Sequence, residues 1–279
     1  WAFGNGLRYD VAHAHDWHAG LLPVLLGRMF RTSAIPHRLP SVFTVHDLAY
    51  QGLFDASWLP RLGLEWDLMR LDAMEFWGRI SYLKAGLVFS RLVTSASPRY
   101  AQEVQTPDRG YGFDGVLRER SGDLIGILNG IDYDQWDPEG DRNLPGPFRA
   151  SKLEGKRAAK REALQACGLP VDEGTLNRPL VALLSPLVAA KGLDLIEAIA
   201  DELPRVGAAF AQLGEGDRHY EDLWLALAAR YPDRVSARIG EDEALLHLLI
   251  GGADVLLMPS RIEPCGQRQM QALRYGTIP

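Results

Sequence analysis

The second half of the chain alternates between short apolar runs and longer amphipathic segments. Runs of strand length lie at residues 180–184, 208–213, 235–239 and 253–258. Apolar residues at helical spacing fill the segments between them, at 192–202, 218–230 and 242–251. This regular alternation predicts a parallel sheet whose strands are joined by right-handed helical crossovers.

The first half alternates in the same way but less cleanly. We expect strands at residues 8–15, 41–46, 92–95 and 124–128. Helical spacing appears at 19–30 and through the long mixed segment 66–90, and Ser97-Pro98 has the composition of a helix start. Residues 110–114 predict a glycine-rich loop.

Residues 134–147 interrupt all periodicity, with three prolines and two glycines. An amphipathic, charged helix is predicted directly afterwards, from Lys152 to Cys167. We therefore predict two α/β domains that face a cleft, residues 1–140 and residues 148–279.

Composition narrows the class of protein. The 279 residues are 47% hydrophobic and carry a net charge of −6, which fits a globular chain and argues against nucleic acid or an anionic membrane as partner. No apolar stretch is long enough to span a membrane, and the two cysteines require no disulfide framework, so a reducing compartment fits. Because the chain starts at Trp1 without a methionine and stops just after a predicted helix, we expect an internal fragment, in which a targeting peptide cannot be assessed.

Polar residues follow the predicted strands at the edge where open α/β sheets bind ligands. They are Asp16, His46, Asn129, Lys191, the turn 214–217 and Glu263. Since they come from both halves, the sequence predicts a site between the domains. In the turn after the last strand, Glu263 and Gly266 would hold a carboxylate beside free helix N–H groups, which suits a polar, anionic ligand. An ordinary turn with an exposed glutamate explains that segment equally well.

Other chemistries find less support. His13, His15 and His18 invite a metal site, but no distant ligand set accompanies them, so we favour buried or turn-capping histidines and expect no metal. No Walker A loop, dinucleotide fingerprint or serine nucleophile elbow is present. Gly214 and Gly216 form a G-x-G pattern, which taken alone indicates only a tight turn. Lys191, taken alone, is best interpreted as a solvent-exposed lysine.

Several short motifs follow one another in order along nearly the whole chain: 13–20 (HAHDWHAG), 44–52 (TVHDLAYQG), 81–86 (SYLKAG), 110–115 (GYGFDG), 126–132 (GILNGID), 191–194 (KGLD) and 259–266 (PSRIEPCG). Taken together, these motifs resemble those of bacterial glycogen synthase and plant starch synthase. The resemblance implies a glycosyltransferase with two Rossmann-like domains (the GT-B fold). It further implies transfer of glucose from ADP-glucose to the non-reducing end of an α-1,4-glucan, with retention of configuration and without a metal or other cofactor.

The resemblance also implies roles for single residues. His46 and Asn129 would hold the donor glucose, with His46 near the reacting carbon, and Glu263 would bind the sugar hydroxyls. Lys191 and the amides around Gly266 would bind the phosphates, with Cys265 and Gly214 on the donor side. Asp16 and Trp17 would lie on the acceptor side, and Asp16 joins His46 and Glu263 as a catalytic candidate. The expected compartment is the bacterial cytoplasm, with a plastid as the alternative.

The chain departs from the family pattern at four places. The family's N-terminal Lys-x-Gly-Gly loop would precede Trp1, and so is missing. Pro186 stands where the family has a phosphate-binding arginine, and Glu241 stands where an aromatic residue stacks on the adenine. Gln267-Arg268 replaces a leucine and a small polar residue, and one hypothesis is that Arg268 partly replaces the lost arginine; drift, or a base-level error in the sequence, is the simpler account. These changes leave two alternatives open, a transferase with another nucleotide-sugar donor and a degenerate copy that binds glucan without turnover.

Overall fold

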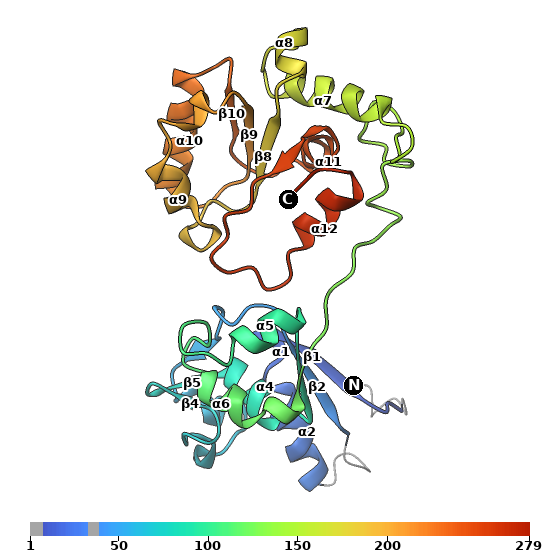
Figure 1. The fold of residues 1–279 in the computed structure, drawn as a ribbon. Helices are drawn as coiled ribbons and strands as arrows, with labels where there is room; N and C mark the ends of the chain where they lie inside the picture. Colours follow the sequence, from blue (N-terminus) through green and yellow to red (C-terminus); the bar gives the residue numbers. More distant parts are fainter. Residues whose placement is uncertain (1–7, 33–38) are drawn as a thin grey trace. The chain divides into compact units, whose positions relative to one another are not determined.

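The structure, a computed structural model, describes residues 8–32 and 39–279. The chain divides into two compact units, residues 1–129 and residues 130–279. Both are α/β units built on a parallel sheet (Figure 1), as the hydrophobic pattern predicts.

The first unit contains a four-stranded parallel sheet with the strand order β1-β2-β6-β7. The strands are β1 (Ala12–His15), β2 (Ser41–Val45), β6 (Leu92–Ser95) and β7 (Leu124–Gly126). The helices that connect and cover them are α1 (Asp16–Ala19), α2 (Leu22–Arg31), α4 (Tyr82–Phe89), α5 (Pro98–Glu103) and α6 (Asp114–Glu119), with a short α3 (Trp58–Arg61) in a long connection. Phe43, Leu87 and Val93 are buried between sheet and helices. Because neighbouring strands pair in parallel, their carboxyl ends lie at one edge of the sheet.

The prediction of helices across residues 66–90 is mostly wrong. Only α4 is an α-helix; before it come a single 3-10 turn (Trp66–Leu68) and two strands, β4 (Glu75–Phe76) and β5 (Arg79–Ser81). These strands pair antiparallel with each other, and β5 also pairs with β3 (Leu53–Phe54). Trp77 and Gly78 both have positive φ angles, 52° and 76°, which is the backbone of a two-residue hairpin turn. That turn, rather than a helix, sets the conformation of the segment.

The second unit contains a sheet with the strand order β10-β9-β8-β11, all parallel. Its strands are β8 (Leu180–Leu184), β9 (Ala209–Leu213), β10 (Val235–Arg238) and β11 (Val255–Leu256). Alternate residues of β8 enter different clusters: Leu180, Ala182 and Leu184 belong to one, and Leu183 to the other. Burial on both faces explains why these strands are nearly continuous apolar runs.

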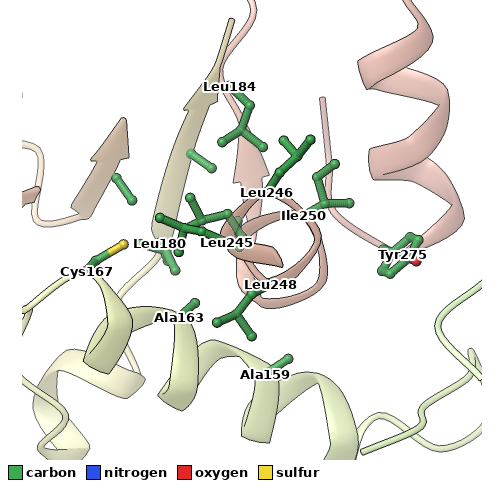
Figure 2. Close-up of a cluster of buried hydrophobic side chains, with 14 of the residues drawn as sticks. Ala159, Ala163, Cys167, Leu180, Leu184, Leu245, Leu246, Leu248, Ile250 and Tyr275 are labelled. Carbon is green, nitrogen blue, oxygen red and sulfur yellow. The ribbon is translucent and has the colours of Figure 1, made fainter. Parts of the chain in front are cut away.

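Helices cover both faces of the second sheet (Figure 1). One face packs against α9 (Leu193–Ala198) and α10 (Arg218–Arg230). The other packs against α7 (Glu154–Ala166), α11 (Glu243–Gly252) and α12 (Gln267–Arg274), and a single turn, α8 (Glu173–Leu176), precedes β8. Figure 2 shows the contact of this second face, where Leu246 and Leu248 of α11 lie among side chains from α7 and β8.

Residues 134–147, which the sequence marks as the domain boundary, lie inside the second unit. Trp136 and Leu144 are buried in its core, and the Trp136 ring stacks on His247 of α11 with centroids 3.9 Å apart. Asp141 accepts hydrogen bonds from His247 Nδ1 at 2.7 Å and from the Tyr275 hydroxyl at 2.6 Å. The segment lacks periodicity because these contacts with α11 and residue 275 hold it, rather than a helix or strand of its own. Across residues 8–32 and 39–279, no helix combines the length and apolar character needed to cross a bilayer.

Candidate functional site

A cavity of about 570 Å³ opens at the carboxyl edge of the second sheet. The loops after all four strands line it, with Pro186 after β8, Gly214 after β9, Glu241 after β10 and Glu263 after β11. Lys191 and Arg268 also line it. The parallel topology therefore brings together residues that are up to 84 positions apart (Leu184 and Arg268), as expected for a ligand site at the strand ends.

Lys191 and Glu263 form an ion pair in this cavity. The Lys191 Nζ atom lies 2.8 Å from Glu263 Oε2, and the Ser260 hydroxyl donates to the same oxygen at 3.0 Å. Both charged side chains are largely shielded, with 22% and 29% of their surface exposed. The cation and the carboxylate therefore hold each other in place, and both remain open to a ligand in the cavity. Ser260 is a residue that the motif analysis did not single out.

Two glycines allow the loops around the cavity to touch. Gly192 has a φ of +74°, and a Cβ there would lie 2.1 Å from the carbonyl oxygen of Pro259. Gly214 has a φ of +147°, and its Cβ would lie 2.2 Å from the carbonyl oxygen of Ser185. Any side chain would separate these backbones, so glycine is required by both conformation and space.

Gly266 and Cys265 lie in the loop just before α12 and are not among the residues that line the cavity. Gly266 is the N-cap of α12, in the left-handed conformation with φ 77° and ψ 41°. It sets the direction in which the first-turn N–H groups of α12 point. The thiol of Cys265 is free and partly exposed. Both remain predicted donor-binding residues, through the backbone rather than through a side chain in the cavity.

In the first unit, Asp16 and His46 lie side by side at the ends of β1 and β2. Asp16 Oδ1 accepts a hydrogen bond from the backbone N–H of His46 at 2.8 Å. Asp16 also has a positive φ of 52°, which aspartate tolerates better than most residues. His15 Nδ1 lies 3.0 Å from His46 Nε2, and a partial loss of hydration at this otherwise exposed ring, together with neighbouring His13 and His46, lowers the pKa of His15. His15 is thus part of this group, although the sequence predicted only a buried or turn-capping histidine at this position.

Trp17 and Asn129 occupy the same sheet edge of the first unit. Trp17 lies in α1 directly after Asp16, and its ring packs so closely on Gly52 that a Cβ there would lie 2.6 Å from Trp17 Cε3. Asn129 follows β7, whose continuation is bound to β6 by the 2.9 Å hydrogen bond from Ile127 N–H to the Ser95 carbonyl. The positions of these residues fit the predicted sugar-binding roles, which stay predictions.

The histidine-rich segment is built differently from the expectation of buried or capping rings. His13 and His15 are exposed on one face of β1, with ring centroids 4.2 Å apart. His13 Nε2 lies 2.7 Å from the hydroxyl of Thr44 on the neighbouring strand. These rings therefore form a polar row that leads along β1 to Asp16 and His46.

Structural comparison defines the class of protein. The catalytic domain of starch synthase IV from Arabidopsis thaliana, solved bound to ADP and acarbose, superimposes with a TM-score of 0.92 and 34% sequence identity, covering 100% of this chain and 57% of that one. HepE of Anabaena, solved in complex with UDP, superimposes with a TM-score of 0.55 at 17% identity, covering 96% of this chain and 58% of that one, and shares the fold alone. The fold is that of the GT-B glycosyltransferases.

Sequence comparison defines the family. The glycogen synthase of Koribacter versatilis is 46% identical over 270 residues, which are 97% of this chain and 55% of that protein. The glycogen synthase of Anaeromyxobacter sp. is 47% identical over 274 residues, 98% of this chain and 57% of that protein. Residues 2–119 match the family model of the starch synthase catalytic domain. The chain belongs to the glycogen synthase and starch synthase family, and it spans 55% to 57% of the length of these relatives.

Proposed function

We propose that the protein containing this chain transfers glucose from ADP-glucose to the non-reducing end of an α-1,4-glucan, with retention of configuration. The observation that carries the proposal is the cavity at the strand ends of the second unit, in which Lys191 and Glu263 are paired. Family membership supports the same reaction class, and a solved relative is described as bound to ADP and acarbose.

In this proposal the second unit holds the donor. The Lys191 ammonium and the first-turn N–H groups of α12 bind the diphosphate, whose negative charge grows as it leaves. Glu263 then accepts hydrogen bonds from the glucose hydroxyls. Gly214 and Gly266 serve by allowing the backbone to come close to the ligand, and Cys265 contributes through the same loop.

The first unit supplies His46, Asn129, Asp16 and Trp17. The backbone N–H of His46 donates to Asp16 Oδ1, so the Asp16 carboxylate lies beside the His46 backbone. In the proposal, this carboxylate stabilises the positive charge that develops on the glucosyl carbon. Trp17 offers an aromatic face, which suits the apolar side of a sugar ring.

The reaction balances without a cofactor. The bond between the glucosyl carbon and the diphosphate oxygen breaks, the bond to the acceptor hydroxyl oxygen forms, and the hydroxyl proton is released with ADP. We propose that positioning and the cations Lys191 and Arg268, rather than a metal ion, provide the rate. The rate of the full-length protein should therefore be unchanged by EDTA.

A second function is favoured by two residues of the cavity. Pro186 and Glu241 both line it, where the family pattern has an arginine and an aromatic residue. Proline contributes no positive charge or N–H donor, and a carboxylate cannot stack on adenine. A degenerate copy that binds glucan without turnover would have these features.

One assay separates the two functions. The full-length protein is incubated with glycogen and either radiolabelled ADP-glucose or radiolabelled UDP-glucose. Incorporation from ADP-glucose alone is the proposed result. Glycogen binding without incorporation from either donor would support the degenerate copy, and incorporation from UDP-glucose alone would assign another donor.

A further inference from the structure

The charges that line the cavity of the second unit do not match a diphosphate well. The carboxylates are Glu215, Glu241, Asp242, Glu243 and Glu263, and the cations are Lys191 and Arg268. Of these cations, Lys191 is already paired with Glu263. A dianionic or trianionic ligand entering this cavity is repelled by several carboxylates, so each cation there has an unusually large influence on binding.

Arg268 differs from Lys191 in its surroundings. Its Nη1 donates to the side-chain oxygen of Gln271 at 3.0 Å, and its guanidinium lies over the Trp136 ring at 5.9 Å from the centroid. Among the residues that the structure describes, no carboxylate oxygen comes within 4.0 Å of this guanidinium. The guanidinium is thus a partly buried positive charge that holds only neutral partners, and an anion in the cavity can bind it without displacing an ion pair.

We propose that Arg268 is a diphosphate-binding residue of this cavity, and that Trp136 is its positioning residue. The inference rests on the proposed function, since it assigns the part of the donor that Arg268 holds. The Trp136 ring contacts both neighbours: the Arg268 guanidinium lies over it at 5.9 Å from the centroid, and the His247 ring stacks on it with centroids 3.9 Å apart. Trp136 is buried, and His247 is bound to Asp141, so the platform under the guanidinium is rigid.

The two residues of this contact come from distant segments of the chain. Trp136 lies in the segment that follows the first unit, whereas Arg268 lies in the first turn of α12. A planar guanidinium can bind two phosphate oxygens at once and stack on an indole ring, which lysine cannot do in the same way. Burial lowers the pKa of Arg268, in part opposed by Glu243, yet an arginine keeps its charge at neutral pH.

The test measures binding of ADP, AMP and adenosine to the full-length protein by calorimetry. Arg268→Gln should weaken ADP binding by about 10- to 100-fold, from the loss of a hydrogen bond between charged groups, and leave adenosine binding unchanged. Arg268→Lys should recover part of the ADP affinity. The matched control is Arg274→Gln in the last turn of the same helix, where the arginine is paired with Asp137 and should leave all three affinities unchanged.

Trp136→Leu should reproduce the phosphate-selective loss and add little to Arg268→Gln in the double variant, because both changes remove the same interaction. An ADP affinity of Arg268→Gln within about twofold of the wild type would overturn the proposal, as would an equal loss for adenosine. A full additional loss in the double variant would overturn the role of Trp136. If Trp136→Leu does not fold, Trp136→Phe, which keeps a smaller aromatic ring, should show a smaller phosphate-selective loss, and wild-type ADP affinity in that variant would overturn the role of the indole ring. If the wild type shows no glucosyl transfer but Arg268→Gln still loses affinity for ADP and not for adenosine, this inference stands and the proposed function is rejected. If the wild type does not bind ADP at all, both are rejected.

Discussion

The ammonium group of Lys191 lies 2.8 Å from Glu263 Oε2, and that oxygen also accepts the Ser260 hydroxyl. The two charged residues are 72 positions apart and come from the loops after neighbouring strands, β8 and β11. The pairing links the proposed phosphate-binding cation directly to the proposed sugar-binding carboxylate. It predicts that the two residues will respond differently to substitution.

Removing the carboxylate should separate nucleotide binding from turnover. In Glu263→Gln, Lys191 loses its charged partner and stays available, so ADP should bind as tightly as in the wild type or more tightly. Glucose incorporation should fall by about 100-fold or more, as for other groups that hold a reacting centre. Lys191→Gln should instead weaken ADP binding. Calorimetric titration with ADP measures the affinity of both variants. Equal losses of ADP affinity in the two variants would contradict this division of roles.

Asp16 should have a structural and a chemical role that two substitutions can separate. Asp16→Asn keeps a side-chain oxygen for the His46 N–H and tolerates the positive φ, so its stability in urea should stay close to the wild type. Asp16→Ala loses that acceptor and should be about 1–3 kcal/mol less stable. If the carboxylate charge assists the reaction, Asp16→Asn should still lower the rate by about tenfold or more. A wild-type rate in the asparagine variant would assign Asp16 a structural role alone.

Gly192 should be more sensitive to substitution than a glycine that has a positive φ but open space around it. Gly192→Ala adds a left-handed alanine, which costs about 1–2 kcal/mol, and brings its Cβ into the Pro259 carbonyl. The control is Gly207→Ala, because Gly207 has a similar φ of +79° but has open space around it. We expect the denaturation midpoint to fall further for Gly192→Ala, together with a loss of ADP affinity. A denaturation midpoint that falls further for Gly207→Ala than for Gly192→Ala would show that the loop containing Pro259 can move away from residue 192 at little cost in stability.

Lys156 should give the second unit a distinctive pH dependence. Its Nζ donates to the Gly251 and Tyr275 carbonyls at 3.0 and 3.1 Å, and burial lowers its pKa from 10.5 to about 8. Between these two pH values the unfolded chain keeps a proton that the folded chain releases, so stability rises with pH. The stability of the wild type relative to Lys156→Met should therefore be constant below pH 8 and increase by about 1–3 kcal/mol between pH 8 and 10.5. Urea denaturation across this range measures the difference, and a flat difference would contradict the shift.

The second unit was the easier half to predict from the sequence. Strand 180–184 and helix 218–230 match the structure residue for residue, because the strand is buried on both faces and the helix has one apolar face. The segment 66–90 failed because a small antiparallel sheet depends on a two-residue turn at Trp77-Gly78 and on long-range pairing with Leu53 and Phe54. Apolar spacing alone does not distinguish such a segment from a helix.

The candidate site, like the fold, was predicted only in part from the sequence. Lys191, Gly214 and Glu263 could be grouped in advance because parallel strands end at one edge, and the structure places all three around one cavity. The contact of Trp136 with Arg268, which lines the cavity, could not be predicted, because Trp136 lies in a segment without periodicity and is held by His247, 111 positions further along the chain. Ser260 and His15 act through single hydrogen bonds to Glu263 and His46, which no spacing in the sequence reveals.

The most direct test of the account follows ADP release and chain growth together in the full-length protein. With ADP-glucose and glycogen, we predict that one ADP is released for each glucose added, that the new linkages are α-1,4, and that Glu263→Gln lowers both signals by about 100-fold or more while still binding ADP. Wild-type protein that binds ADP and glycogen but releases no ADP would contradict the account.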